Sequence, residues 1–421
     1  MTEGKLDATL IAEWVAAPDL AVGHDGDYYE YRDGIYVRDP HVVTRLTAQA
    51  LGRAYTPGVQ RQVEAHLHNQ DVPRVGVRSL PSGYLDYIVL ENGVYWWRER
   101  ELRPHQRSLG AITKLPIRFD AVAASPAFDR WLLQVLGDDA EMHRHIWEVL
   151  GYLLMTGNPL QKIVLLIGEG GNGKGTFLRV LGRLLGEENF SSVSLHTLVE
   201  DRFAAASLHG MIANISGDLS SRFLNEPEIL KQVTGGDAIQ TARKYGQMFK
   251  FVPYAVPVFA ANEPFRTSDS SYGWRRRWEV IEFSRHVLGS GEFNEQHLFD
   301  EASGIFNRAM EGLRRLMDRG RFDPPTAAQE ATTRLHDAAD PFMLWIAEDE
   351  NVFRGPDHSA ERDDVFKRYR QWCRDSGYQP VAKHVLGRRL NQIGITSTQT
   401  RAGGRARRLY VGIGVNLLPD D

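Results

Sequence analysis

The sequence predicts an α/β protein with a buried sheet in the middle of the chain and a smaller unit at each end. Apolar runs typical of fully buried strands occur at residues 163–167, 211–218, 254–261 and 280–283. A glycine-rich loop and apolar residues at helical spacing follow the first run, which indicates a strand–loop–helix unit. Near the C-terminus, three amphipathic helical segments precede two strands joined by a basic loop.

The composition is that of an ordinary globular chain. Its 421 residues suggest two to four domains, and 42% apolar with 25% charged residues is typical of soluble domains. No apolar run approaches the roughly 18 residues of a membrane helix, and the N-terminus lacks the pattern of a secretion signal. The single cysteine, Cys373, excludes an internal disulfide framework and fits a reducing cytoplasm. We expect no membrane partner, and the net charge of −4 limits nucleic-acid binding to local patches.

Residues 1–125 predict a mixed α/β accessory domain. Aromatic strands at 28–37 are joined by Asp33-Gly34, which is typical of a tight hairpin, and a second strand pair is expected at 87–97. The aromatic residues of the first hairpin either form one face of a small core or provide a stacking platform for bases. Helices are expected within the first 20 residues and over 40–70. An amphipathic helical lead-in follows at 126–156.

Residues 163–185 have the pattern of a phosphate-binding loop. After the buried strand the chain reads Gly168-Glu-Gly-Gly-Asn-Gly-Lys174, and a helical stretch follows. This order directs backbone N–H groups and a helix N-terminus at phosphate oxygens, and Lys174 is expected to reach the β- and γ-phosphates of ATP. The alternative is a glycine-rich turn with an unrelated lysine. The expected nucleotide-binding residues are Gly168, Gly170, Gly171, Asn172, Gly173, Lys174, Gly175 and Thr176.

The expected Mg²⁺ ligands depart from the usual pattern. The residue after the lysine is usually Ser or Thr, but here it is Gly175, and Thr176 comes one position later. Thr176 must replace the usual hydroxyl, or water and other groups must hold the metal. Asp218, at the end of the second buried strand, is the expected acidic partner of Mg²⁺. Its neighbours supply no second acid to polarise a water molecule.

Three further features follow along the chain. Residues 239–251 alternate in polarity around Lys244, which predicts a hairpin with a basic, aromatic tip. Asn262 ends the third buried strand, where an amide could sense the γ-phosphate or position water. Arg275-Arg-Arg277 precede the fourth strand. They are either solvated surface residues or arginine fingers of a ring ATPase.

These motifs resemble those of superfamily 3 helicases, specifically the phage and plasmid primase–helicase branch related to the poxvirus primase–helicase. Residues 28–158 also resemble the accessory domain of that branch, most clearly at Glu91-Asn-Gly-Val94 and Leu102-Arg-Pro-His105. The motifs that carry the resemblance are the glycine loop, Asp218, Lys231 with Thr234-Gly-Gly-Asp237, Asn262 and Arg275-Arg-Arg-Trp278.

The resemblance implies a P-loop AAA+-type ATPase core over residues 157–335. In such a core Lys174 and Asp218 would bind Mg²⁺-ATP, and Asn262 would be the sensor. Arg277, with Arg276 as the second choice, would be the arginine finger that acts across a subunit interface. The hairpin residues Arg243 and Lys244 would contact DNA. Family members form hexameric rings that move 3′→5′ along single-stranded DNA. A polymerase-type primase module has no room here, so we expect no primase activity in this chain.

Residues 341–421 predict a winged-helix-like DNA-binding domain. From Glu361 to Asp421 there are 12 basic and six acidic residues, whereas the remainder of the chain is acidic. Such asymmetry indicates contact with phosphate backbones, although a solvated basic surface or an acidic protein neighbour would also explain it. The candidate DNA contacts are Lys383, Arg388, Arg389, Arg405, Arg407 and Arg408.

The sequence therefore favours an ATP-dependent, ring-forming DNA helicase of phage or mobile-element replication in a bacterial host cytoplasm. Its expected partners are single-stranded and forked DNA, further copies of itself and a separate primase or initiator. The alternative is a replication initiator that uses ATP to assemble on origin DNA with little unwinding, which Gly175 and the lone Asp218 favour. A small-molecule kinase would leave the Thr234-Gly-Gly-Asp237 block unexplained. A regulatory or defence ATPase with the same core stays open.

Overall fold

A computed structural model gives the fold of two compact units, which are described separately. The first comprises residues 1–219, 228–262 and 276–329, and the second has its main body at 330–421. Among the described residues, no helix combines the length and apolar character that crossing a membrane requires. The structure describes residues 8–15, 19–23, 25–69, 74–76, 84–201, 203–217, 219, 224, 228–242, 248–265, 267, 269, 271–286, 294–338, 340–376, 378, 380–402 and 405–417.

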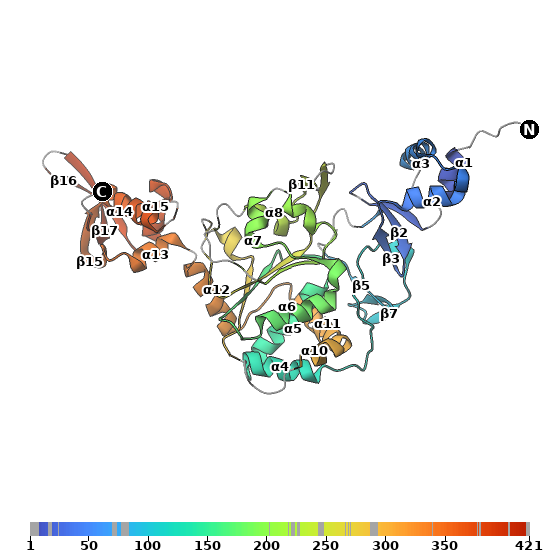
Figure 1. Cartoon of the computed structure of the whole chain (residues 1–421). Coiled ribbons are helices and arrows are strands. Elements are labelled where there is room, and N and C mark those ends of the chain that lie inside the picture. Colours follow the sequence, from blue (N-terminus) through green and yellow to red (C-terminus); the bar gives the residue numbers. More distant parts are fainter. Residues whose placement is uncertain are drawn as a thin grey trace, which may run out of the picture. The chain divides into compact units, whose positions relative to one another are not determined.

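A five-stranded sheet forms the centre of the first unit, with the strand order β14-β8-β13-β10-β9 (Figure 1). All its paired strands run parallel. Every residue of β8 and β13 is buried, which explains why their sequences are continuously apolar rather than alternating. The predicted buried strands are confirmed, with bounds shifted by a few residues. They are β8 (Ile163–Ile167), β10 (Ala213–Ser216), β13 (Val256–Ala261) and β14 (Trp278–Glu282). The fifth strand, β9 (Phe190–Ser191), was not predicted and is only half-buried.

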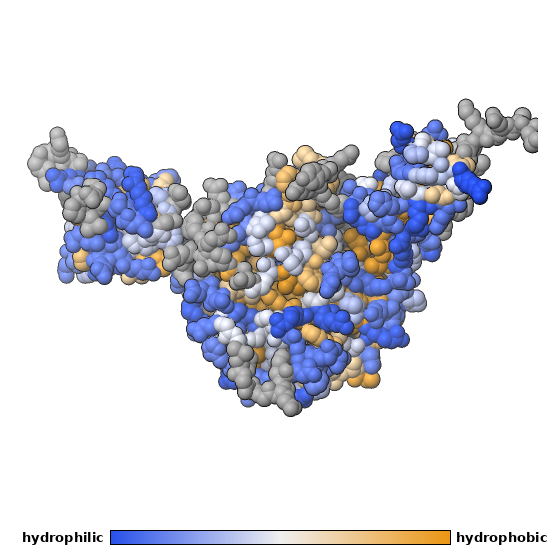
Figure 2. Space-filling view, viewed as in Figure 1, coloured by the Kyte–Doolittle hydropathy of each residue, from blue (hydrophilic) through white to orange (hydrophobic). Residues whose placement is uncertain are grey.

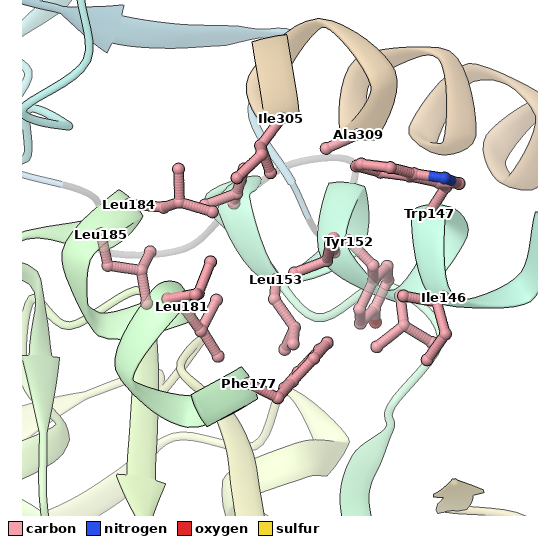
Figure 3. Packing of buried hydrophobic residues seen from close by; sticks show 14 of the residues in the cluster. Ile146, Trp147, Tyr152, Leu153, Phe177, Leu181, Leu184, Leu185, Ile305 and Ala309 are labelled. Carbon is pink, nitrogen blue, oxygen red and sulfur yellow. The ribbon is translucent and has the colours of Figure 1, made fainter. Parts of the chain in front are cut away.

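Helices cover both sides of this sheet. In Figure 1, α7 and α8 lie on one side, and α4, α5, α10 and α11 lie on the other. Phe177 and Leu181 of α6 point toward Leu153 of α5, and Ile305 of α11 lies nearby (Figure 3). The bounds are α4 (Pro126–Leu136), α5 (Ala140–Leu154), α6 (Lys174–Leu185), α7 (Leu195–Glu200), α8 (Glu228–Gly235), α10 (Gln296–Asp300) and α11 (Ala302–Arg319). The helix α9 (Tyr272–Arg275) belongs to the second unit, and α12 (Thr326–Ala338) begins in the first unit and continues into the second.

Two glycines allow α5 and α11 to approach closely. A Cβ atom on Gly151 would lie 2.2 Å from the carbonyl oxygen of Ala309, and one on Gly312 would lie 2.2 Å from that of Trp147. Any side chain at either position would therefore force the helices apart. The predicted helical lead-in at 126–156 is thus confirmed as α4 and α5, and it is packed into the core that supports the sheet.

The N-terminal part forms a four-stranded sheet of order β3-β2-β1-β4. Its hairpin turns at Asp33 and Gly34, whose positive φ values of 47° and 94° suit a two-residue primed turn. Tyr29 and Tyr36 are each 4% exposed and belong to a small cluster, so these two aromatic residues serve as core. The bounds are α1 (Ala8–Val15), β1 (Leu20–Gly23), β2 (Tyr28–Arg32), β3 (Ile35–Arg38), α2 (Val42–Leu51), α3 (Pro57–Asn69) and β4 (Arg74–Val75).

The second strand pair of the N-terminal region belongs to the central core. The strands β5 (Tyr87–Leu90), β6 (Gly93–Trp96) and β7 (Glu101–Arg103) form a separate antiparallel sheet. Leu90, Tyr95 and Trp97 are buried in the same cluster as the residues of α5 and α6. The hydrophobic core thus crosses the boundary expected at residue 125.

A buried ionic group lies under the start of β8. Glu279 on β14 is 3% exposed, with His145 Nε2 3.1 Å from its Oε1 atom and Lys162 Nζ 2.9 Å from its Oε2 atom. Burial alone would raise the pKa of Glu279, but contact with His145 and the charge of Lys162 hold that pKa below its ordinary value. The ionised Glu279 carboxylate therefore stabilises the fold at pH values above the pKa that this group has in the unfolded chain. That contribution is lost as pH falls through the lower folded-state pKa.

The Glu279→Gln variant is expected to lose roughly 3 kcal/mol of unfolding free energy at pH 7, because it leaves two partners facing a neutral amide in a buried site. The difference from the unmodified protein should be smaller at pH 3 than at pH 7, because the stabilisation by the carboxylate is lost progressively as pH falls from the unfolded-state pKa toward the lower folded-state pKa. Urea denaturation at both pH values measures it. Glu311→Gln, on the exposed face of α11, is the matched control and should change little. An equal loss at both pH values would contradict the ionic explanation.

Residues 340–417 of the second unit form the helices α13, α14 and α15 and a three-stranded antiparallel sheet of order β15-β17-β16. The three helices and the last two strands confirm the predicted elements, whereas β15 was not predicted. Its side chains are mostly exposed and it includes Gly355 and Pro356, so no alternating pattern marks it as a strand. The bounds are α13 (Pro341–Glu348), β15 (Val352–Glu361), α14 (Arg362–Asp375), α15 (Lys383–Gln392), β16 (Thr396–Ala402) and β17 (Arg405–Val415).

Candidate functional site

The glycine loop between β8 and α6 has a shape that only glycine permits at two positions. Gly168 has a φ of 146°, and a Cβ atom there would lie 2.2 Å from the carbonyl oxygen of Phe283. Gly173 has a φ of 100°, and its Cβ atom would lie 2.7 Å from Val135. The Asn172 side chain donates a hydrogen bond to the same Phe283 carbonyl, which fixes the loop against the end of β14.

The donors of this loop are arranged to receive an anion. Lys174 is 7% exposed, and its Nζ atom donates to the carbonyls of Gly168 and Glu169 (2.8 Å for Glu169) and to Asn172 Oδ1 at 3.2 Å. Burial lowers the pKa of Lys174. The backbone N–H groups of residues 169–174 donate no hydrogen bond to any described residue. Unused N–H groups around a buried ammonium group fit the phosphates of a nucleotide.

An open groove runs along α6, from Gly175 to the residues that follow the helix. Its volume is about 920 Å³, which is in the range of small-molecule sites. Gly175 and Gly182 of α6, Gly217 after β10 and the side chains of Leu178, Arg179 and Phe190 are among its lining residues. The groove therefore lies between α6 and the end of β10, and it begins at Gly175, the residue after Lys174.

Thr176 is not free to act as the missing hydroxyl ligand in this arrangement. It is 9% exposed, and Arg179 Nη2 donates to its Oγ1 atom at 3.3 Å. Arg179 is held in turn by Glu295, with Nε 2.9 Å from Oε1. A metal ion would have to compete with this guanidinium. The sequence analysis did not identify Arg179, although its position one helical turn after Gly175 was a usable signal.

Two other expected residues follow strands that end at the same edge. Ile167 pairs with Ala261, so Asn262 follows β13 directly beside the glycine loop, and its side chain is exposed. The strand β10 ends at Ser216 on this edge, because it runs parallel to β13. Asp218 lies outside the described residues. Ligand sites of parallel sheets lie at the carboxyl ends of the strands, which agrees with this grouping.

The arginine block lies at the opposite edge of the sheet. The carbonyl of Arg277 accepts a 2.7 Å hydrogen bond from the N–H of Ile163, the first residue of β8. Arg277 is 7% exposed, and its Nε atom donates to Thr234 Oγ1 at 2.8 Å. Arg276 is exposed and donates to Gln161. Of the two candidate fingers, the second choice, Arg276, is therefore the one with an exposed side chain.

The predicted hairpin is confirmed as β11 (Ile239–Ala242) paired antiparallel with β12 (Met248–Phe251). Ile239 and Phe251 at its base are each 5% exposed. Its expected DNA contacts, Arg243 and Lys244, lie outside the described residues.

The basic residues of the second unit differ in their availability. Arg389 is bound to the buried Asp340 and covers the ring of Phe342, so it holds α15 and α13 together and is not a free surface cation. Lys383 is paired with Asp363, and Arg407 with Glu361, but both are at the surface. The side chains of Arg388 and Arg408 are exposed, and Arg405 begins β17. The visible face of this unit is mostly hydrophilic (Figure 2).

Comparison with known proteins gives two family matches and a shared fold. Residues 166–277 match a family of unknown function, DUF5906, and residues 51–137 match the family described as D5 N terminal like. The A form apo structure of the NrS-1 C terminal region has a TM-score of 0.55 at 13% identity, covering 97% of this chain and 100% of that chain. A further apo structure of that region gives 0.54 at 12% identity, with the same coverage. The likeness to these structures shows the fold.

The first family match begins within β8 and ends at Arg277. It therefore spans the glycine loop, the block around Thr234, the hairpin and the arginine block. The D5 N terminal like match lies in the preceding part of the chain, from α2 to the end of α4.

Proposed function

We propose that the chain is an ATP-driven DNA helicase subunit that forms a ring in phage or mobile-element replication. The observation that carries the proposal is the glycine loop, with its buried Lys174 and unused N–H groups, at the carboxyl edge of a parallel sheet. The resemblance to superfamily 3 helicases supplies the AAA+-type core, the hexameric ring and 3′→5′ movement. The two family matches and the shared fold support the same assignment.

ATP would be held by Gly168, Gly170, Gly171, Asn172, Gly173, Lys174, Gly175 and Thr176. In this role the loop N–H groups bind phosphate oxygens. The Lys174 ammonium group gives up its hydrogen bonds to the loop carbonyls and binds the β- and γ-phosphates instead. Asp218 would hold Mg²⁺, which neutralises charge on the transferred phosphoryl group. Asn262, exposed beside the loop, would position the attacking water.

The arginine finger in this proposal acts between subunits. Arg276 precedes β14, and the five residues of that strand span roughly 16 Å before the edge that holds the glycine loop. An arginine side chain cannot cover that distance. Arg276 can therefore reach a nucleotide only if that nucleotide belongs to a neighbouring subunit, which is the reason for proposing a ring.

The second unit would bind DNA as a winged-helix-like domain. Its elements follow the order helix, strand, helix, helix, strand, strand, and its last helix and hairpin carry the exposed cations. The DNA contacts we favour are Arg388, Arg405 and Arg408. We add Lys383 and Arg407, each of which forms a surface ion pair with an acidic residue. The buried pairing of Arg389 gives it a structural role.

Replacing Arg388 and Arg408 together by Ala is expected to weaken binding to DNA and to reduce the slope of log affinity against log salt by about 1.8, because two phosphate contacts are lost. Fluorescence anisotropy at several salt concentrations measures both quantities. Arg374→Ala, an exposed cation of α14 in the same unit, is the matched control and should keep the slope. If the double variant keeps the original slope, DNA does not contact these arginines.

The proposed function is tested by measuring ATP hydrolysis with and without single-stranded DNA, and unwinding of a forked duplex. A helicase should hydrolyse ATP faster on DNA and separate the strands. ATP-dependent assembly on DNA without unwinding would instead support the replication initiator. That alternative is favoured by Gly175 at the usual hydroxyl position and by the guanidinium on Thr176, since both weaken the expected metal site.

A further inference from the structure

The two sequence blocks that distinguish this chain from other phosphate-loop proteins contact each other. Arg277 Nε donates to Thr234 Oγ1 at 2.8 Å, and the Thr234 hydroxyl donates onward to the Leu230 carbonyl at 2.6 Å. Thr234 is 1% exposed and Arg277 is 7% exposed. Because a buried guanidinium and a buried hydroxyl each need a partner, the contact fixes α8 to the start of β14.

A second connection runs beside the first through Gln161. Its Nε2 atom donates to the Gly235 carbonyl at 3.1 Å, and its Oε1 atom accepts a hydrogen bond from Arg276. Gly235 is the last residue of α8, so its carbonyl has no partner within the helix. Gln161 has a φ of 56°, which is unfavourable for a residue with a side chain. These two hydrogen bonds therefore hold Gln161 in a strained backbone position.

Both connections hold the C-terminal end of α8, which leads into the base of the β11–β12 hairpin. Only residues 236–238 separate the end of α8 from Ile239, the first residue of β11. Ile239 pairs with Phe251, and both are buried. A displacement at Gly235 is thus passed to the hairpin within a few residues.

We propose that the contact between Arg277 and Thr234 is a fixed pivot for this hairpin. The hydrogen bonds from Arg276 to Gln161 and from Gln161 to Gly235 then couple the position of the hairpin to whether Arg276 binds the nucleotide of a neighbouring subunit. The proposal rests on the proposed function for the ATP and DNA roles of the two ends. Arg277 and Gln161 are positioning residues in it. Arg277 acts through α8 and does not reach across the subunit interface.

The physical reason for a switch is competition for one guanidinium. A phosphate group is a stronger partner for Arg276 than the neutral amide oxygen of Gln161. When Arg276 turns to phosphate, Gln161 loses one of its two hydrogen bonds and the restraint on its unfavourable φ. Its hold on the Gly235 carbonyl then weakens, while the buried Arg277–Thr234 contact stays in place as the pivot.

Two substitutions in the whole 421-residue chain separate the parts of this proposal. Gln161→Glu keeps an acceptor for Arg276 but removes the N–H donor to Gly235. Thr234→Val removes the hydroxyl at nearly constant volume, and Thr234→Ser restores it. Gln134→Glu, exposed on α4, is the matched surface control. The measurements are amide hydrogen exchange at residues 239–242 and 248–251, the KM for ATP and the factor by which single-stranded DNA stimulates hydrolysis.

Gln161→Glu and Thr234→Val are expected to speed exchange in the hairpin strands and to lower the DNA stimulation factor about fivefold or more. Thr234→Ser should restore both, and the KM for ATP should hold, because the glycine loop lies at the other edge of the sheet. Unchanged hairpin exchange in both variants overturns the proposal, as does a change in KM without a change in stimulation. If single-stranded DNA does not stimulate ATP hydrolysis by the unmodified protein, the helicase assignment fails. In that case the hydrogen-exchange rates of the variants alone decide whether Gln161 and Thr234 hold the hairpin.

Discussion

The Lys174→Ala variant is expected to lose ATP turnover by about 10²- to 10³-fold, the size of effect seen when one preorganised donor to transition-state charge is removed. Lys174 Nζ contacts the Gly168 and Glu169 carbonyls and the Asn172 side chain of the glycine loop. Its replacement leaves the loop N–H groups in place, so nucleotide binding should weaken less than turnover. Phosphate release under saturating ATP and the affinity for a fluorescent ATP analogue measure the two effects separately.

Arg183→Ala provides the control, because Arg183 is an exposed cation on the same helix. It should retain turnover, and both variants should keep the melting temperature. Turnover that survives in Lys174→Ala would show that this loop is not the site of hydrolysis, whatever other activity the chain has. Loss of turnover in both variants would point to a general effect of charge on α6.

The sequence was sufficient for elements whose pattern is local. The strands β8 and β13 are continuously apolar, and the Asp33-Gly34 turn is marked by its own chemistry, so both were predicted. In contrast, β15 has an exposed, irregular sequence and becomes a strand only because Val352 and Glu361 lie opposite residues of β17. Pairing between segments more than 40 residues apart leaves no signal in the shorter strand itself.

The candidate site likewise combines features that a local pattern predicts with features that depend on distant residues. The glycine loop could be read from spacing, because its backbone conformation depends on the glycines it contains. No local pattern distinguishes Arg276 from Arg277. Burial of Arg277 depends on Thr234, and burial of Arg389 depends on Asp340, 49 residues away. Both arginines looked like functional cations in the sequence, and both have partners supplied by the tertiary fold.

Replacing Arg276 by Ala is expected to reduce ATP turnover by about 10³-fold or more if this residue completes a neighbour's site. The variant should bind the ATP analogue normally, because Arg276 lies at the edge of the sheet away from its own glycine loop. Arg277→Ala should behave differently. It leaves the buried Thr234 hydroxyl without its donor, so it should lower stability and hairpin protection as well as turnover.

Mixing two inactive proteins tests the position of Arg276 directly. A Lys174→Ala subunit lacks a working loop but still offers Arg276, whereas an Arg276→Ala subunit has a working loop but no finger. If the finger acts between subunits, mixed rings contain some interfaces with both parts intact, and turnover returns when the proteins are combined. If Arg276 served its own loop, no mixture would contain a complete site and turnover would stay absent. Recovery would therefore establish the shared site and the assembly together, since neither can be complete in a single chain.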